Sequence, residues 1–290
     1  MNNYGTLLKK IRLEKGLSQK DVYSGIMTRQ TYYLIETNVS MPSFDKFLLI
    51  LEKLFLSVKE FLYLLDPEAF PEESHLYYQM SQAVFKKDEQ CLKFLVQSAE
   101  QFYKTTNNQK YFHLYLIAQA MLLINFKTEG IKTNHSLKRL MRPIKNYLIG
   151  VDTWYLYELK LLNNALYCFN LAEAISLSNL VTQKVGALSQ TEAFQDAKLR
   201  IYLNLSSLCL SYKDYTHTMH FSKLAKQNAL MDYRLFETLI ADLNYAIAHS
   251  AVTSKQQTAK IKKYLEILDY LDYDKIVEEY QNILKTNGIN

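Results

Sequence analysis

The sequence is poor in the residues that interrupt helices. Its 290 residues include only 7 glycines and 4 prolines, while tyrosine occurs 23 times. Turns and strand ends are rich in glycine and proline, and no alternating apolar run bounded by such residues stands out. The composition therefore disfavours a fold of many short strands and predicts an all-α protein.

Cysteine and long apolar runs are also scarce. The three cysteines, Cys91, Cys168 and Cys209, are odd in number and have no metal-like spacing, which is typical of reduced core residues in a cytosolic protein. No apolar run approaches the roughly 20 residues of a membrane span, and no signal peptide is recognisable. We therefore expect a cytoplasmic protein with no membrane partner.

Signals of catalysis are equally few. The chain has no glycine-rich phosphate loop, and nothing around the cysteines suggests a nucleophile. His217 and His220 share a helix face with Asp214 nearby, but no third metal ligand is evident. We expect neither an enzyme nor a bound cofactor.

The first 65 residues contain the signals of five short helices. A basic amphipathic stretch ends at Gly16, and Ser18–Asp21 forms a capping box that starts a second helix. Thr28 can cap a third helix over residues 29–36, a turn at residues 41–43 precedes a fourth, and a capping box at Ser57–Glu60 starts a fifth. This order predicts a helix-turn-helix domain whose third helix enters the major groove of double-stranded operator DNA.

The polar residues at two helix starts are the candidates for DNA contact. Arginine and glutamine can bind guanine and adenine, respectively, through two hydrogen bonds, and a helix start is suited to phosphate contact. The candidates at the third helix are Thr28, Arg29, Gln30 and Thr31, and those at the second are Gln19 and Lys20. Residues 1–65 hold 9 Lys+Arg against 6 Asp+Glu, so +3 of the net charge of +5 lies there.

Two runs of residues carry a resemblance to a known family. Leu17–Val22, with Gly25 and Ile26 after it, and Val151–Leu159 with its Trp-x-x-Tyr-Glu-Leu pattern resemble Rgg/GadR/MutR-type regulators, a branch of the peptide-responsive regulators of Gram-positive bacteria. The resemblance implies a pheromone sensor and covers nearly the whole chain.

That resemblance also assigns roles to single residues. It implies that the carboxylate of Glu36 is tied to Arg12, and we interpret this pair as structural because a partly buried charge needs a partner. Related sequences usually carry serine and arginine at the positions of Tyr33 and Leu34, and glycine at that of Asn38. The missing arginine would remove one positive contact.

The domain boundary is expected at residues 66–71, where two prolines lie within five residues. We therefore predict a helix-turn-helix domain over residues 1–66 and a second domain over residues 71–290. Helix pairs beginning near residues 71, 108, 150, 192 and 232 recur roughly every 40 residues, which predicts a tetratricopeptide-like, right-handed solenoid. A single amphipathic helix from Tyr273 to about Thr286 would cap it or pair with another chain.

Three asparagines recur within this array. Asn163, Asn204 and Asn244 lie 41 and 40 residues apart in Leu-Asn-x-small sequences. Asparagine is a poor residue in the middle of a helix, but its amide can pair with both backbone groups of an extended peptide. We therefore predict an asparagine ladder that binds a short linear signalling peptide, with Asn164 as a substitute for Asn163. Hydrogen bonding between helices is the alternative explanation.

Two further side chains could line the same surface. Arg200 lies one helical turn before Asn204 and could bind a peptide carboxylate, although a solvated arginine is the alternative. Tyr167 lies one turn after Asn163. We predict a homodimeric regulator whose concave face binds a peptide that favours one of two dimer arrangements. A regulator without a peptide ligand, controlled by a protein partner or constitutively active, and a scaffold with a vestigial DNA-binding domain are the alternatives.

Overall fold

The computed structural model describes residues 3–66, 73–126, 130–231, 233–253 and 257–289. These residues form helices α1 to α16 and two short 3-10 segments, and the only β-type pairing among them is an isolated bridge between Trp154 and Val185. The predicted all-α class is therefore confirmed. None of the described helices is long and apolar enough to cross a membrane.

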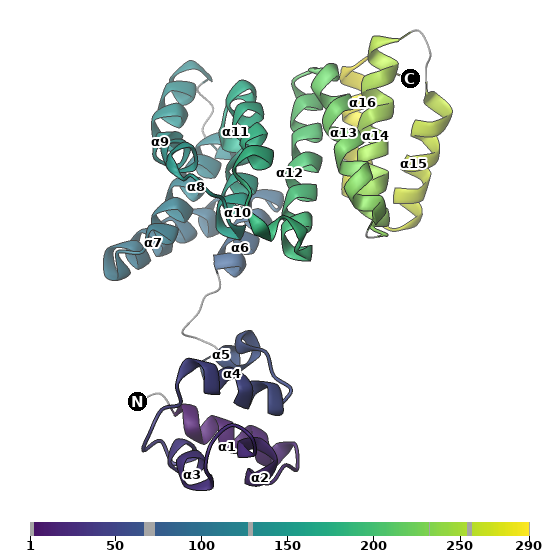
Figure 1. Cartoon of the computed structure of the whole chain (residues 1–290). Helices are drawn as coiled ribbons and strands as arrows, with labels where there is room; N and C mark the ends of the chain where they lie inside the picture. The colour runs from purple at the N-terminus through teal and green to yellow at the C-terminus, as the bar shows by residue number, and fades with distance from the viewer. Residues whose placement is uncertain (1–2, 67–72, 127–129, 232, 254–256, 290) are drawn as a thin grey trace. The chain divides into compact units, whose positions relative to one another are not determined.

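Contacts divide the chain into two compact units, residues 1–76 and 77–290. We call helices α1–α5 the N-terminal domain and helices α6–α16 the repeat domain. The predicted boundary at residues 66–71 lies almost wholly outside the described residues. The two domains are described separately below (Figure 1).

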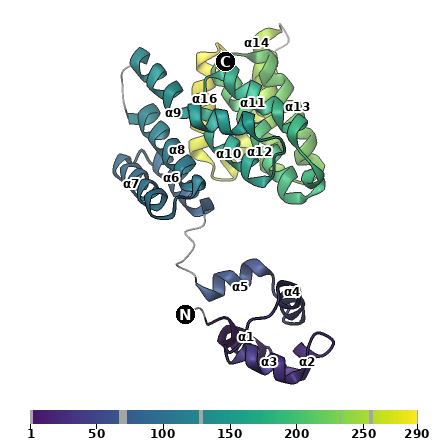
Figure 2. The same ribbon diagram turned by 60° about the vertical axis from the view of Figure 1, so that its left-hand side comes forward.

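The N-terminal domain contains all five predicted helices. They are α1 (Tyr4–Glu14), α2 (Gln19–Tyr23), α3 (Arg29–Glu36), α4 (Phe44–Lys53) and α5 (Val58–Leu65). Both capping boxes form: the Ser18 hydroxyl accepts from the Asp21 N–H at 3.3 Å, and the Ser57 hydroxyl accepts from the Glu60 N–H at 3.1 Å. Figures 1 and 2 show α2 and α3 on the side of the domain opposite α5.

A small apolar core holds these helices together. Its largest fully buried side chains include Tyr32 and Phe61. Each buried aliphatic side chain of this core contributes roughly 1.5–3 kcal/mol to the stability of the domain. The core residues are Leu8, Ile11, Val22, Tyr32, Ile35, Ile50, Leu51, Leu54 and Phe61. Because α1, α3, α4 and α5 all supply members, the core fixes α3 against the rest of the domain.

Asn38 ties the end of α3 to α1. Its backbone is left-handed, with φ of 58°, a region that asparagine tolerates better than most residues. Its side-chain oxygen accepts from the Gly5 N–H at 2.8 Å, and its side-chain amide nitrogen donates to the Thr6 hydroxyl at 2.7 Å. The asparagine thus replaces the expected glycine and adds two bonds to α1.

The repeat domain consists of the five predicted helix pairs and a final single helix. The pairs are α6 (Glu73–Phe85) with α7 (Glu89–Thr106), α8 (Gln109–Phe126) with α9 (Gly130–Gly150), α10 (Leu156–Ala165) with α11 (Leu171–Lys184), α12 (Glu192–Ser211) with α13 (Tyr215–Met231), and α14 (Leu235–Val252) with α15 (Thr258–Tyr270). Helix α16 spans Asp274–Thr286. The tetratricopeptide-like fold class is confirmed, and successive pairs stack side by side (Figures 1 and 2).

The Trp154 segment explains why the third pair begins at residue 156 rather than near 150. The Trp154 side chain is buried, and its indole N–H donates to the Leu148 carbonyl at 3.0 Å. Its backbone N–H donates to the Lys184 carbonyl at 2.8 Å, and the Lys184 ammonium donates to the Val151 carbonyl at 2.7 Å. The connection between α9 and α10 is therefore bound to the end of α11.

The rest of the Trp-x-x-Tyr-Glu-Leu run is also structural. The Tyr157 hydroxyl lies 2.7 Å from Nδ1 of buried His113, and the Tyr147 hydroxyl donates to Glu158 at 2.6 Å. Burial lowers the pKa of His113 to about 4. These polar bonds join α8, α9 and α10.

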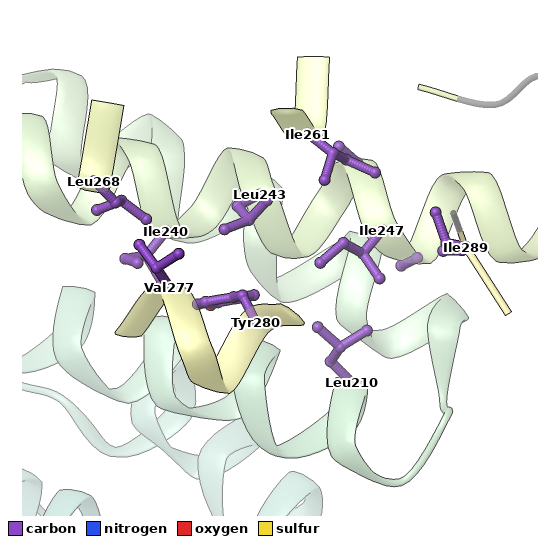
Figure 3. Close-up of a cluster of buried hydrophobic side chains, with 11 residues drawn as sticks. Leu210, Ile240, Leu243, Ile247, Ile261, Leu268, Val277, Tyr280 and Ile289 are labelled. Atoms are coloured by element: carbon purple, nitrogen blue, oxygen red, sulfur yellow. The ribbon is translucent and has the colours of Figure 1, made fainter. Parts of the chain in front are cut away.

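Helix α16 packs on the last helix pairs through a buried cluster (Figure 3). Val277 and Tyr280 of α16 meet Ile240, Leu243 and Ile247 of α14 in this cluster. Farther along the helix, the Lys213 ammonium donates to the Thr286 carbonyl at 3.0 Å. The predicted capping helix thus closes the array on its own chain.

Candidate functional site

The start of α3 presents two long polar side chains to solvent. Thr28 caps the helix by accepting from the Thr31 N–H at 3.2 Å, and the two threonine hydroxyls lie 2.8 Å apart. Arg29 and Gln30 are exposed, and within the described residues neither side chain has a hydrogen-bond partner. Of the four candidates on α3, these two are therefore the ones available for base contact.

The two candidates on α2 differ in their surroundings. Lys20 is exposed and suited to phosphate contact, whereas Gln19 is half-buried. The Gln19 amide nitrogen donates to Glu36 at 2.7 Å. Gln19 is thus already engaged inside the domain, and Lys20 is the better candidate.

Tyr33 is a surface residue of α3 that the sequence marked only as a departure from related proteins. Its side chain is 55% exposed and lies one helical turn after Arg29, on the same face. The four-residue spacing was the signal that could have identified it. Tyr33 therefore joins the candidate DNA-contact surface.

A buried ion pair holds α3 in place. The Arg12 guanidinium donates to both carboxylate oxygens of Glu36, at 2.6 and 3.0 Å, and to the Leu17 carbonyl at 2.8 Å. Burial raises the pKa of Glu36, but hydrogen bonds from Arg12 and Gln19 outweigh burial and keep it below its ordinary value. The pairing expected from the resemblance is confirmed, and it fixes α3 to α1 and α2.

In the repeat domain, two of the three repeated asparagines contact each other. The Asn204 amide nitrogen donates to the Asn163 side-chain oxygen at 2.9 Å, and both residues are half-buried. Within the described residues, the Asn163 amide nitrogen and the Asn204 side-chain oxygen have no further partner. The pair joins α10 to α12 and still offers one donor group and one acceptor.

The third asparagine corrects the prediction of a continuous ladder. Asn244 is fully buried, and its amide nitrogen donates to the hydroxyls of Ser206 and Ser207 at 2.8 and 3.0 Å. Its side-chain oxygen accepts from the Tyr280 hydroxyl at 2.6 Å. Because α16 covers it and all its polar atoms are engaged, Asn244 is a packing residue in this structure, as the alternative explanation holds.

The remaining candidates lie around the Asn163–Asn204 pair. The Tyr167 hydroxyl donates to the Asn204 carbonyl at 3.4 Å, and burial raises the pKa of Tyr167. Arg200 is exposed but already paired with Asp196 at 3.0 Å. Asn164 is half-buried and has no hydrogen-bond partner within the described part of the chain. The structure thus brings Asn163, Tyr167 and Asn204 together.

The cysteine and histidine patterns give no metal cluster among the described residues. Cys168 and Cys209 are buried, which raises the pKa of each thiol to about 12, and Cys91 is half-buried. The His217 ring donates through Nδ1 to the neighbouring Asp214 carboxylate at 2.7 Å, next to the start of its own helix. These contacts are structural.

Two families match the chain. Residues 8–61 match the helix-turn-helix family, and residues 95–282 match the C-terminal domain of the HTH-type transcriptional regulator Rgg. The chain belongs to the Rgg family. The resemblance drawn from the Trp154 and Ser18 runs is thereby confirmed, and so is the interpretation as a DNA-binding transcriptional regulator.

Solved structures share the fold of this Rgg-family chain over nearly its full length. A transcriptional regulator from Listeria monocytogenes EGD-e is 17% identical, with a TM-score of 0.78 and coverage of 100% of this chain and 99% of that one. The SHP pheromone receptor Rgg2 from Streptococcus dysgalactiae is 16% identical, with a TM-score of 0.71 and coverage of 98% and 99%. PrgX in complex with cCF10 is 15% identical, with a TM-score of 0.72 and coverage of 99% and 93%.

Proposed function

We propose that this Rgg-family protein is a cytoplasmic, homodimeric transcriptional regulator that contacts operator DNA through α3 and binds a short linear peptide on its repeat domain. The main support for the DNA site is that Arg29 and Gln30 are exposed on α3, which the Arg12–Glu36 ion pair fixes to α1. Lys20 and Tyr33 extend that surface, with Gln19, Thr28 and Thr31 supporting the helix starts.

The Arg29→Ala substitution tests the DNA site. If Arg29 binds a guanine through two hydrogen bonds, its loss weakens operator binding by ~1–3 kcal/mol and relaxes base preference at one position. Fluorescence anisotropy with promoter DNA measures both effects. Lys59→Ala, an exposed cation on α5 across the domain, is the matched control. Equal behaviour of the two variants would refute this placement of the recognition surface.

Peptide binding rests on the Asn163–Asn204 pair. One free amide nitrogen and one free side-chain oxygen are the groups needed to bind both backbone groups of one peptide residue. Tyr167, Asn164 and Arg200 border the pair, and Arg200 would have to exchange its bond to Asp196 for a peptide carboxylate. The pheromone receptor and the PrgX complex that share this fold support a peptide ligand.

The alternative without a peptide also has an observation in its favour. Two of the asparagine side chains bond to each other and the third is enclosed, as expected if all three only join helices. Isothermal titration calorimetry with synthetic linear peptides, on the wild type and on Asn204→Ala, distinguishes a peptide site from asparagines that only join helices. Peptide binding that Asn204→Ala weakens at least several-fold, while Asn228→Ala does not, supports the peptide site. Failure of every peptide to bind favours control by a protein partner.

The homodimer is a proposal for the repeat domain. Tyr233, just before α14, is 95% exposed, and Tyr270, the last residue of α15, is 86% exposed. The start of α14 and the turn after α15 lie side by side, because the rings of Phe236 and Tyr273 are 5.1 Å apart. Such a patch on a folded protein is typical of an association surface. Sedimentation should show a dimer that Tyr233→Asp converts to a folded monomer.

A further inference from the structure

The charge of the repeat domain is concentrated on one helix. Helix α9 contains five lysines and arginines and no acidic residue in its 21 positions. Residues 66–290 hold 25 Lys+Arg and 23 Asp+Glu, a net charge of +2, so without α9 the same stretch has a net charge of −3. The surplus of positive charge in this half of the protein therefore comes entirely from α9.

Three of these cations form a stripe on the outer face of the helix. Lys138, Arg139 and Arg142 are exposed, whereas Met141 and Ile144 of the same helix are buried. Both views show α9 at the edge of the repeat domain (Figures 1 and 2). Within the described residues, no carboxylate pairs with any of the three.

This arrangement differs from that of other surface lysines in the repeat domain. Lysines on α7 and α15 pair with a glutamate one turn away: Lys93 with Glu89, Lys104 with Glu100, and Lys262 with Glu266. On α9 the residue four positions after Lys138 is itself a cation, Arg142. Arg142 lies three residues from Arg139 and four from Lys138, and like charges at these spacings destabilise a helix.

The fourth described cation of α9 shows how such a charge is neutralised when it serves the fold. The Lys145 ammonium donates to Glu173 of α11 at 2.6 Å and is half-buried. The three outer cations have no equivalent partner on α11 or on α9 itself. An anion from outside the chain would relieve their mutual repulsion.

We propose that the outer face of α9 binds the phosphate backbone of duplex DNA, as a second DNA contact in addition to that of the N-terminal domain. DNA provides closely spaced phosphates at regular intervals, and arginine binds phosphate through two parallel hydrogen bonds. This inference rests on the proposed function, in which α3 binds duplex DNA and so brings a polyanion to the protein. The contact is independent of base sequence because it reaches only phosphates.

The test uses the full chain and a fluorescently labelled, mixed-sequence duplex of about 60 base pairs, well beyond two half-sites one helical turn apart. Binding is measured by anisotropy over a series of salt concentrations. The test variant replaces Lys138, Arg139 and Arg142 with glutamine. The control variant replaces Lys93, Lys104 and Lys262 with glutamine and therefore changes the net charge equally.

The expected result is a change in salt dependence for the test variant alone. The slope of log affinity against log salt concentration should become shallower by up to ~2.7, about 0.9 for each lost phosphate contact. The control variant should keep the wild-type slope. Equal slopes in all three proteins, or equal flattening in both variants, would overturn the proposal. Since all substituted residues are exposed, circular dichroism should confirm that both variants stay folded.

Discussion

In this Rgg-family protein, the contacts that join helices within each domain differ in their chemistry between the two domains. In the N-terminal domain a buried ion pair, Arg12 with Glu36, fixes α3. In the repeat domain the ion pair of Lys145 with Glu173 is more exposed, and an enclosed contact joins two neutral side chains, Asn244 and Tyr280. Removing one partner of a buried ion pair leaves the other charge without its counterion, whereas an amide bonds to almost any polar group.

That difference explains which sequence-based interpretations were correct. The family resemblance implied that Glu36 is paired with Arg12, and this pairing is confirmed. Asn244 could have faced a peptide, a serine or a tyrosine, and its sequence context was shared with Asn163 and Asn204. The residue type alone did not decide between these partners.

The largest expected effect is that of Glu36→Gln in the N-terminal domain. The substitution leaves the Arg12 guanidinium buried without its anion, which should cost roughly 3–5 kcal/mol. A domain of this length has a total stability of roughly the same order. We expect loss of DNA binding. We also expect an unfolding phase at low urea concentration, which far-ultraviolet circular dichroism would detect.

The single tryptophan provides an internal control for that experiment. Trp154 lies buried in the repeat domain, so its fluorescence should report an unchanged unfolding midpoint in Glu36→Gln. Glu14→Gln, which removes an exposed partner of Lys10, should behave like the wild type. A Glu36→Gln protein that binds DNA normally and shows no early phase would contradict the structural role of the pair.

Sequence alone predicted most of the architecture because the relevant signals are local. Capping residues such as Ser18 and Ser57 act within one helical turn, and they marked the starts of α2 and α5 correctly. The return of α16 onto α14 depends on residues 36 positions apart, Asn244 and Tyr280. No local pattern encodes that contact, so the enclosure of Asn244 could not be foreseen.

The second-largest effect is expected for Asn244→Ala in the repeat domain. The change leaves the buried Tyr280 hydroxyl without an acceptor and should destabilise the domain by about 1–3 kcal/mol. Thermal unfolding followed by circular dichroism measures the shift. Asn228→Ala is the control, because among the described residues the Asn228 amide bonds only to the Leu224 carbonyl of its own helix. A shift no larger than that of the control would show that Asn244 is not enclosed in solution.

The pH dependence of the repeat domain should come from His113. Burial lowers its pKa to about 4 from an ordinary value of 6.5. The folded state therefore disfavours the charged ring. The contribution of neutral His113 to the stability of the folded state is complete above the unfolded pKa of 6.5, and it is lost as the pH falls from 6.5 toward 4. Between pH 7 and pH 5 the repeat domain should lose about 1–2 kcal/mol.

A comparison of two proteins isolates that contribution. Urea midpoints of the wild type and His113→Gln, followed by Trp154 fluorescence, are measured at pH 7 and pH 5. The wild type should lose more stability than the variant over this interval, since glutamine does not titrate. Identical losses in both proteins would place the acid sensitivity elsewhere.

The smallest effect is expected for the pair Asn163 and Asn204, and it tests the contrast between enclosed and open amides. Both residues are half-buried, so water can replace the lost partner in each single alanine variant. A double-mutant cycle on urea unfolding should therefore give a coupling energy of about 0.5–1 kcal/mol, below the effect of Asn244→Ala. If the coupling is zero, the bond between the two amides is not maintained in solution. All polar atoms of both side chains are then available to bind a peptide. If it exceeds the effect of Asn244→Ala, the pair is itself a packing contact and the peptide site must lie elsewhere.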